Sequence, residues 1–396
     1  MRKEYNIACI DNNSSNEFLR CLWSRLRFNF GKLAWNTFPC KISEKQLILI
    51  GYIDLAIEDE GNHTITITCT YSKKGCIKTL SWDAGKLSEP EKFIRKFDTS
   101  IKEAKDHPKF KKENYLSCTL GQYIKFEKIL GRNFSLQNDL LIIKILGYDK
   151  EDIHTFSQQY FRIICDYLTF DTIRFINKKN SGIDTIRSYN DRVVSFSDFN
   201  SGEVYSETRL MDKFINLNIN KSIIDSIDDF LEREFNYDQY KNNFEKSLSM
   251  ISRGIMFEEM IESKFYLDFS PAEYAVMCYM SALEIITIND IKPLKCDTCN
   301  QDIYSIAKRV VSLSENVTDG NPIIKKMISK YYGIRSKFVH TGQFLSSNNY
   351  IGTSIPLLST NSESGLIDQE HIFNKELKFF VKECILWHEA NQNETK

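Results

Sequence analysis

The chain has 396 residues, of which 42% are hydrophobic and 13% aromatic, enough to fill two substantial hydrophobic cores. Its formal net charge of −1 excludes a protein that coats nucleic acid through overall charge, so any nucleic-acid contact must come from a local basic patch. The eleven cysteines follow no disulfide-scaffold pattern, which is typical of a reducing compartment.

The start of the chain, Met1 to Tyr5, is polar and predicts no secretory signal. No apolar run reaches the length of a membrane-spanning helix. We therefore expect a cytoplasmic protein with no membrane partner.

The N-terminal half alternates between helix and strand signals and predicts an α+β domain over residues 1–205. It contains no phosphate-binding glycine loop and no nucleophile elbow, so we expect no catalytic site there. Its histidines, His63, His107 and His154, lack neighbours at ligand spacing. The predicted elements are a helix over residues 16–32, strands over 47–57, 63–71 and 77–82 with a hairpin turn at 59–62, a helix over 88–105, a strand over 140–146 and a helix over 149–170.

A junction is predicted between Ser197 and Ser206, and the pattern is helical from there to the C-terminus. Residues 206–396 are therefore assigned to an all-α domain. Its predicted helices cover residues 222–235, 237–261, a stretch that begins at 270, 304–313, 322–340 and a last helix that carries residues 384–388.

The helix that begins at Ser270 is predicted to be buried. Ser270 and Glu273 form a capping box with proline between them, and the residues that follow are apolar nearly all round the helix. Glu284 is the lone carboxylate after the first turn. A buried carboxylate needs a cationic or hydrogen-bonding partner, and Arg335 is the candidate.

The next-to-last helix carries the most informative residues. Asn321 and Pro322 are a start signal, and Thr341 with Gly342 is a stop signal. Arg335 falls within the apolar stripe, where a guanidinium is costly unless it is paired or offered to a ligand. Tyr331 and Tyr332 can stack on bases. The helix has no acidic residue and offers cations for RNA binding, namely Lys325, Lys326, Lys330 and Lys337.

Arg335 and His340 supply the chemistry of metal-free RNA cleavage. Arginine grips a phosphate in a fork, and histidine exchanges protons near neutral pH. Residues five apart diverge by about 140° on a regular helix. Either the arginine reaches around, the helix distorts near Gly333 or its end, or a subunit interface completes the site. Ser336 lies four residues before His340 and faces it, so its hydroxyl can orient the imidazole.

These residues carry a family resemblance over roughly Ser206 to Trp387. The buried helix with Glu284, the amphipathic helix after it, and the string Tyr332-x-x-Arg335-Ser336-x-x-Val339-His340 resemble the HEPN fold, specifically its ApeA-like branch. Two features depart from the pattern. Thr341 stands where relatives often have glycine, and Ser336 stands where HEPN enzymes outside this branch often have Asn, Asp or His.

The resemblance implies an all-α HEPN domain and a metal-independent endoribonuclease. Arg335 and His340 would be catalytic, with Ser336, Glu284 and Tyr332 in support. It implies no cofactor and no metal, an RNA substrate, a homodimer with the motifs at the interface, and a role in bacterial anti-phage defence by abortive infection. The N-terminal domain would then bind an activating or inhibitory ligand, such as a phage component. The alternative is a non-catalytic HEPN module for dimerisation or nucleotide binding.

One further set of residues has metal-ligand spacing. Cys296 and Cys299 form a single CxxC, while Cys384 and His388 lie four apart on the predicted last helix. Together they could supply four tetrahedral zinc ligands, but the long separation between the pairs makes the pattern unspecific. Ordinary reduced cysteines are the preferred interpretation.

Overall fold

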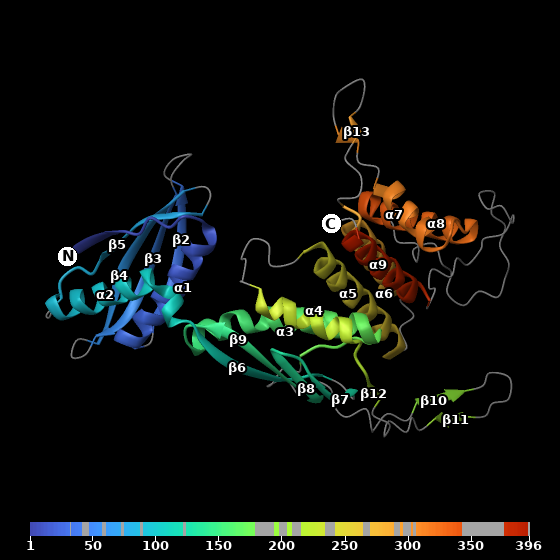
Figure 1. Ribbon diagram of the computed structural model, residues 1–396, viewed down its shortest axis with the longest axis horizontal. Helices are drawn as coiled ribbons and strands as arrows, with labels where there is room; N and C mark the ends of the chain where they lie inside the picture. Colours follow the sequence, from blue (N-terminus) through green and yellow to red (C-terminus); the bar gives the residue numbers. More distant parts are fainter. Residues whose placement is uncertain are drawn as a thin grey trace. The chain divides into compact units, whose positions relative to one another are not determined.

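The computed structural model is a mixed α/β structure, with most strands in the N-terminal half and most helices later in the chain (Figure 1). It divides into two compact units, residues 1–116, 143–159 and 231–240 in the first, and 117–142, 160–230 and 241–396 in the second. The residues described are 1–31, 33–41, 47–57, 61–72, 75–87, 90–121, 124–178, 194–197, 204–207, 215–233, 242–263, 270–288, 294–295, 302–303, 306–342 and 376–394.

The first unit is built on an antiparallel sheet with the strand order β1-β5-β4-β3-β2. Residues of α1 and α2 pack on the side chains of β4 and β5, and Trp82, Phe93 and Phe97 lie at the centre of this core. The elements are β1 (Arg2–Asn6), α1 (Asn12–Phe30), β2 (Leu33–Lys41), β3 (Leu47–Ile57), β4 (Gly61–Tyr71), β5 (Ile77–Asp83), α2 (Pro90–Lys105) and the 3-10 turn η1 (His107–Phe110).

The predicted strands of this sheet are confirmed, whereas its two edge strands were missed. β3 has the predicted bounds, and it pairs with β4 around the predicted hairpin, Ile57 opposite Gly61. β1 is mostly charged and polar, and β2 contains Pro39. Proline and charge are tolerated at a sheet edge because one side of an edge strand has no strand partner, but they hide a strand from a hydrophobic pattern.

A second sheet has the order β12-β7-β8-β9-β6, and its strand β12 corrects the expected all-α assignment of residues 206–396. β12 pairs parallel to β7, with Ile215 opposite Ile124. A three-residue strand has no recognisable period, so only the tertiary pairing reveals it. The strands are β6 (Lys112–Thr119), β7 (Ile124–Leu130), β8 (Phe134–Asn138), β9 (Leu140–Gly147) and β12 (Ile215–Leu217).

Helices make up most of the second unit, and α5 and α6 run side by side within it (Figure 1). They approach closely, because a Cβ added to Gly254 of α5 would lie 2.3 Å from the Tyr279 ring of α6. Lys378 of α9 pairs with buried Glu258 of α5 at 2.8 Å. The helices are α3 (Lys150–Thr172), α4 (Lys221–Glu232), α5 (Asn243–Ser263), α6 (Ser270–Ile286), α7 (Ile306–Val317), α8 (Pro322–Thr341) and α9 (Leu377–Glu394), with short strand pairs β10 (Val194–Ser197)/β11 (Val204–Glu207) and β13 (Leu294–Lys295)/β14 (Asp302–Ile303).

The two units interleave along the sequence, whereas the sequence pattern predicted one boundary between residues 205 and 206. The C-terminal part of α3 explains much of the difference. Its residues Asp166 and Tyr167 are buried and hydrogen-bond to Ser249 and Glu245 of α5, so this part of the helix belongs with the later helices. A long amphipathic helix does not show from its own sequence which partner it packs against.

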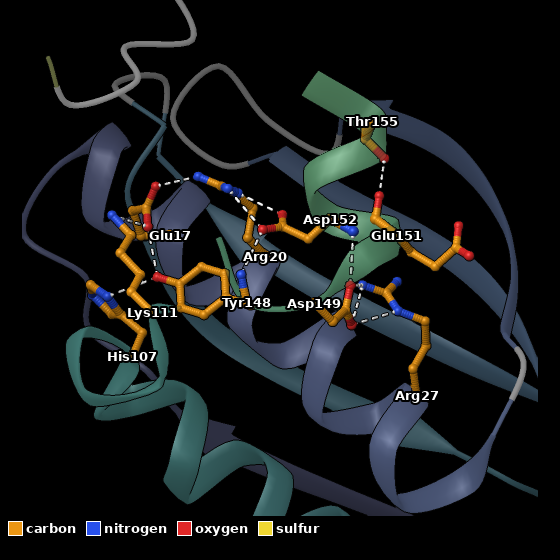
Figure 2. Close-up of polar contacts among 10 residues, drawn as sticks. All are labelled: Glu17, Arg20, Arg27, His107, Lys111, Tyr148, Asp149, Glu151, Asp152 and Thr155. Carbon is orange, nitrogen blue, oxygen red and sulfur yellow. Dashed lines mark hydrogen bonds and ion pairs between the residues drawn. The ribbon is translucent and has the colours of Figure 1, made fainter. Parts of the chain in front are cut away.

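The first unit contains a buried network of charges, which we call the α1–α3 network and define as Glu17, Arg20, Lys111, Tyr148 and Asp152 (Figure 2). The Arg20 guanidinium donates to both oxygens of Asp152 at 2.7 and 2.8 Å and to Glu17 at 2.8 Å. The second Glu17 oxygen accepts from the Tyr148 hydroxyl at 2.6 Å and pairs with Lys111 at 2.8 Å. The two carboxylates therefore meet two cations.

A second arginine fork lies next to this network. Arg27 donates to both oxygens of Asp149 at 2.9 Å, and Asp149 in turn accepts from the backbone N–H of Asp152 at 2.8 Å (Figure 2). Asp149 thus caps the N-terminus of α3 while it holds α1. His107, for which no role was predicted, lies 3.3 Å from the Tyr148 hydroxyl. This arrangement fixes the start of α3 against α1.

Candidate functional site

The predicted start and stop of α8 are confirmed. The Asn321 side chain accepts hydrogen bonds from the N–H groups of Ile323 and Ile324, and Pro322 occupies the first turn. At the other end Gly342 has φ +65°, a left-handed conformation that favours glycine, and its N–H donates to the Phe338 carbonyl at 2.9 Å. The helix runs unbroken through Gly333, so it does not distort there to bring Arg335 towards His340.

One side of α8 is packed into the helical part of the second unit. Its buried residues are Ile328, Tyr331 and Ile334, at intervals of three along the helix. Phe338 lies edge-on to Tyr274 of α6, with the ring centroids 5.8 Å apart. The packing between α6 and α8 fixes the rotation of α8 about its axis and therefore decides which of its polar residues face the protein.

The predicted partnership of Glu284 and Arg335 is confirmed. Arg335 Nη2 donates to Glu284 Oε2 at 2.6 Å, and the two side chains are 20% and 13% exposed. Burial penalises each charge unless it is paired, which explains why the only carboxylate in the later turns of α6 meets the arginine of the apolar stripe. The pair holds the guanidinium against α6.

Tyr332 and Arg309 complete this group. The Arg335 guanidinium carbon lies 5.9 Å from the centre of the Tyr332 ring. Burial and the neighbouring Glu284 carboxylate together raise the pKa of Tyr332 to about 12, although the positive charges of Arg335 and Arg309 act to lower it. Arg309 therefore lies close enough to act on the same hydroxyl. We call Glu284, Arg309, Tyr332 and Arg335 the arginine cluster.

Sequence reasoning missed Arg309, which is only 7% exposed. Its Nη1 donates to the carbonyl of Ile288, just beyond the end of α6, at 2.8 Å. A signal was present in the sequence. Arg309 lies three residues after Ile306 and four before Leu313, within the apolar stripe of α7, which is the same reasoning that singled out Arg335.

His340 lies apart from the arginine cluster. It is exposed in the last turn of α8, and neither a hydrogen bond nor an ion pair links it to Arg335. The predicted contact between Ser336 and His340 is not formed either, although the two residues are one turn apart. A single chain therefore presents Arg335 and His340 on different sides of the helix. Of the three arrangements expected from the sequence, only completion across a subunit interface is left to propose.

The lysines of α8 divide into two groups. Lys326, Lys330 and Lys337 are exposed, and on a regular helix they fall with His340 within an arc of about 80°. Lys325 lies outside this arc and pairs with Glu315 of α7 at 2.6 Å, so it is less suited than Lys326 and Lys337 to hold RNA. We call Lys326, Lys330, Lys337 and His340 the basic face of α8.

The possible zinc ligands are only partly within the described residues. Cys384 and His388 are both buried on α9, and burial raises the pKa of the Cys384 thiol to about 12. Cys296 and Cys299 lie outside the described residues. In the part of the chain that the structure describes, no group of three or more His, Cys, Asp or Glu side chains has a metal-binding arrangement.

No helix among the described residues combines the length and the apolar composition needed to cross a membrane. Comparison of the chain with protein-family models, with curated proteins and with solved structures finds no match.

Proposed function

We propose that the chain is a metal-independent endoribonuclease of HEPN type. The observation that carries the proposal is α8, which holds Arg335 against α6 through Glu284 while its exposed side carries His340 among lysines. An always-charged fork and a titratable imidazole on one helix are the groups that RNA cleavage without a metal requires. The resemblance of this helix to the ApeA-like HEPN motif supports the same reaction.

In the proposed reaction the RNA 2′-hydroxyl attacks the adjacent phosphorus. His340 takes the proton of this hydroxyl or delivers a proton to the departing 5′-oxygen, and Arg335 holds the phosphoryl oxygens as negative charge builds on them. The bond from phosphorus to the 5′-oxygen breaks as the bond to the 2′-oxygen forms. The products end in a 2′,3′-cyclic phosphate and a 5′-hydroxyl.

The proposed active unit is a homodimer, because the two catalytic groups face different sides of α8 within one chain. Pairing two α8 helices about a two-fold axis would let His340 of one chain face Arg335 of the other. The basic face would then draw RNA to the seam, with binding that weakens as salt rises.

The proposed setting is the bacterial cytoplasm, in anti-phage defence by abortive infection. A toxic nuclease needs restraint, and we propose that the N-terminal part of the chain binds the ligand that controls it. Fold-level analogy is the warrant for this step. A C-terminal fragment that gave the same activity and the same response to infection as the full chain would contradict it.

A second candidate is a non-catalytic module for dimerisation or nucleotide binding. One observation favours it: Arg335 is engaged by Glu284 and is not joined to His340. In that case the arginine and the histidine would serve folding and ligand binding rather than bond cleavage.

The deciding experiment expresses the wild-type chain beside His340→Ala in bacteria and sequences RNA 5′ ends. We expect new ends with the wild type in vivo and, with purified protein, cleavage that persists in EDTA. His340→Ala should lower cleavage by about 10²- to 10⁴-fold without loss of folding. Thr341→Ala, at the neighbouring exposed position, is the matched control. Equal cleavage by wild type and His340→Ala would contradict the chemistry, and no cleavage by either would favour the non-catalytic module.

A further inference from the structure

The arginine cluster holds more positive than negative charge. Among the described residues it combines one carboxylate, Glu284, with two guanidiniums, Arg309 and Arg335. Arg309 is more than nine-tenths buried and forms no ion pair with a carboxylate in the described part of the chain. Burying a guanidinium without a matching anion is costly.

Three polar atoms of this cluster are buried without a hydrogen-bond partner: Nε of Arg309, Nε of Arg335 and Oε1 of Glu284. Buried polar atoms in folded proteins are nearly always paired, so such atoms gathered in one place require an explanation. The two Nε groups are donors and carry positive charge. Together they present charged N–H donors that an anion with several acceptor oxygens could bind.

Arg309 also has a structural role, because its bond to the Ile288 carbonyl supports the C-terminal end of α6. That role uses Nη1 alone and leaves the buried Nε of Arg309 without a hydrogen-bond partner. A helix cap alone therefore explains neither the second buried positive charge beside Tyr332 nor the unpaired Nε groups.

We propose that Arg309 is a second phosphate-binding arginine, which together with Arg335 and Tyr332 holds a phosphodiester group of RNA beside the reacting bond. This inference rests on the proposed function for the identity of the ligand. Arg309 supplies charge and a fork-shaped donor set, Arg335 supplies a second, and Tyr332 adds a hydroxyl that lies near Glu284, Arg309 and Arg335. Glu284 holds Arg335 in place, and its single negative charge leaves the cluster with a net charge of +1 that favours anion binding.

The test measures binding of a 2′-O-methyl RNA oligonucleotide, which cannot be cleaved because its 2′-oxygen is blocked. Affinity is measured at several salt concentrations for wild type, Arg309→Gln, Arg309→Lys and the control Lys308→Gln, an exposed neighbour on α7. We expect Arg309→Gln to weaken binding about tenfold and to reduce the salt slope by about one. Arg309→Lys should restore the slope but not the full affinity, because an ammonium is not a fork.

Lys308→Gln should stay within about twofold of wild type, because Lys308 belongs neither to the arginine cluster nor to the basic face of α8. Folded Arg309→Gln that matches wild type in affinity and in salt slope would overturn the proposal. If Arg309→Gln does not fold, wild-type affinity in Arg309→Lys would overturn it equally. A wild-type chain that shows no affinity for the oligonucleotide would also overturn it.

Failure of the nuclease proposal gives a different result. If the chain binds the oligonucleotide through Arg309 but cuts no RNA, the phosphate-site proposal stands and the nuclease proposal fails. If the wild-type chain cuts RNA and Arg309→Gln binds and cuts RNA equally well, the nuclease proposal stands and the phosphate-site proposal fails.

Discussion

The α1–α3 network and the arginine cluster are both shielded from water, but they differ in how their charges are matched. In the network, two carboxylates meet two cations, and the donors and acceptors are shared over short distances (Figure 2). In the cluster, two guanidiniums share one carboxylate, and three buried atoms have no partner. A saturated network stabilises one structure, whereas an unsaturated one is prepared for a ligand.

The same contrast separates two interpretations of buried charge. Perturbed titratable groups mark functional sites, but structural ion pairs perturb pKa values as well. The surrounding cations hold the pKa of Glu17 below its ordinary value even though burial opposes this, and burial raises the pKa of Tyr148. Both groups belong to a complete set of partners, so we interpret the network as structural. The comparison can be tested by breaking each cluster in turn.

The largest stability effect is expected in the α1–α3 network. Arg20→Met should destabilise the first unit by about 3–5 kcal/mol, because it leaves the buried carboxylates of Glu17 and Asp152 without their shared partner. Urea unfolding followed by tryptophan fluorescence measures the effect. The control is Lys109→Met, which removes an exposed ion pair with Asp106 and should change stability by less than about 1 kcal/mol. Equal losses in the two variants would show that the network is not a structural element.

A smaller stability loss is expected in the arginine cluster. Glu284→Gln should cost about 1–3 kcal/mol, since it removes one partner of a pair that is mostly but not fully buried. The same change raises the net positive charge of the cluster, so binding of 2′-O-methyl RNA should tighten even though stability falls. Cleavage should fall because Arg335 is no longer held. A variant with unchanged melting temperature and unchanged cleavage would contradict the role given to Glu284.

Acid should weaken the network in a predictable direction. The folded pKa of Glu17 is lowered from its ordinary 4.5, so its contribution is present above that value and is lost as pH falls through the lowered pKa. Between roughly pH 5 and pH 3, Glu17→Gln should therefore show a shallower fall in unfolding free energy than wild type. Parallel curves for the two proteins would contradict the assignment.

The smallest effect concerns individual lysines on α8. Lys326→Gln and Lys337→Gln should each weaken binding of RNA by a few-fold, or about 1 kcal/mol at most, and lower its salt dependence. Lys325→Gln should do less, because Lys325 is already paired with Glu315. Fluorescence anisotropy across a salt series ranks the three variants. A larger loss of RNA affinity for Lys325→Gln than for the other two variants would indicate that RNA contacts a different side of α8 from the basic face.

Several elements were predictable because their signals are local. The β3–β4 hairpin follows from alternation around a turn, and α8 begins at an Asn-Pro pair and ends at a left-handed glycine. The edge strands β1 and β2 were not predictable in the same way, since edge positions tolerate polar residues and proline. β12 was hidden because its pairing with β7 joins segments far apart in the chain.

The candidate site shows the same division. The sequence by itself determined that Glu284 needs a cationic or hydrogen-bonding partner, with Arg335 as the candidate, because an almost wholly apolar helix buries its single late carboxylate. It also determined that Arg335 and His340 diverge on one helix, because helical rotation is fixed. Only the tertiary structure decided that Arg309 lies near Tyr332 and Arg335, that Lys325 pairs with Glu315, and that His340 stays exposed and apart from this group. These outcomes depend on how separate helices pack, and helix packing is set by side chains that the local sequence does not contain.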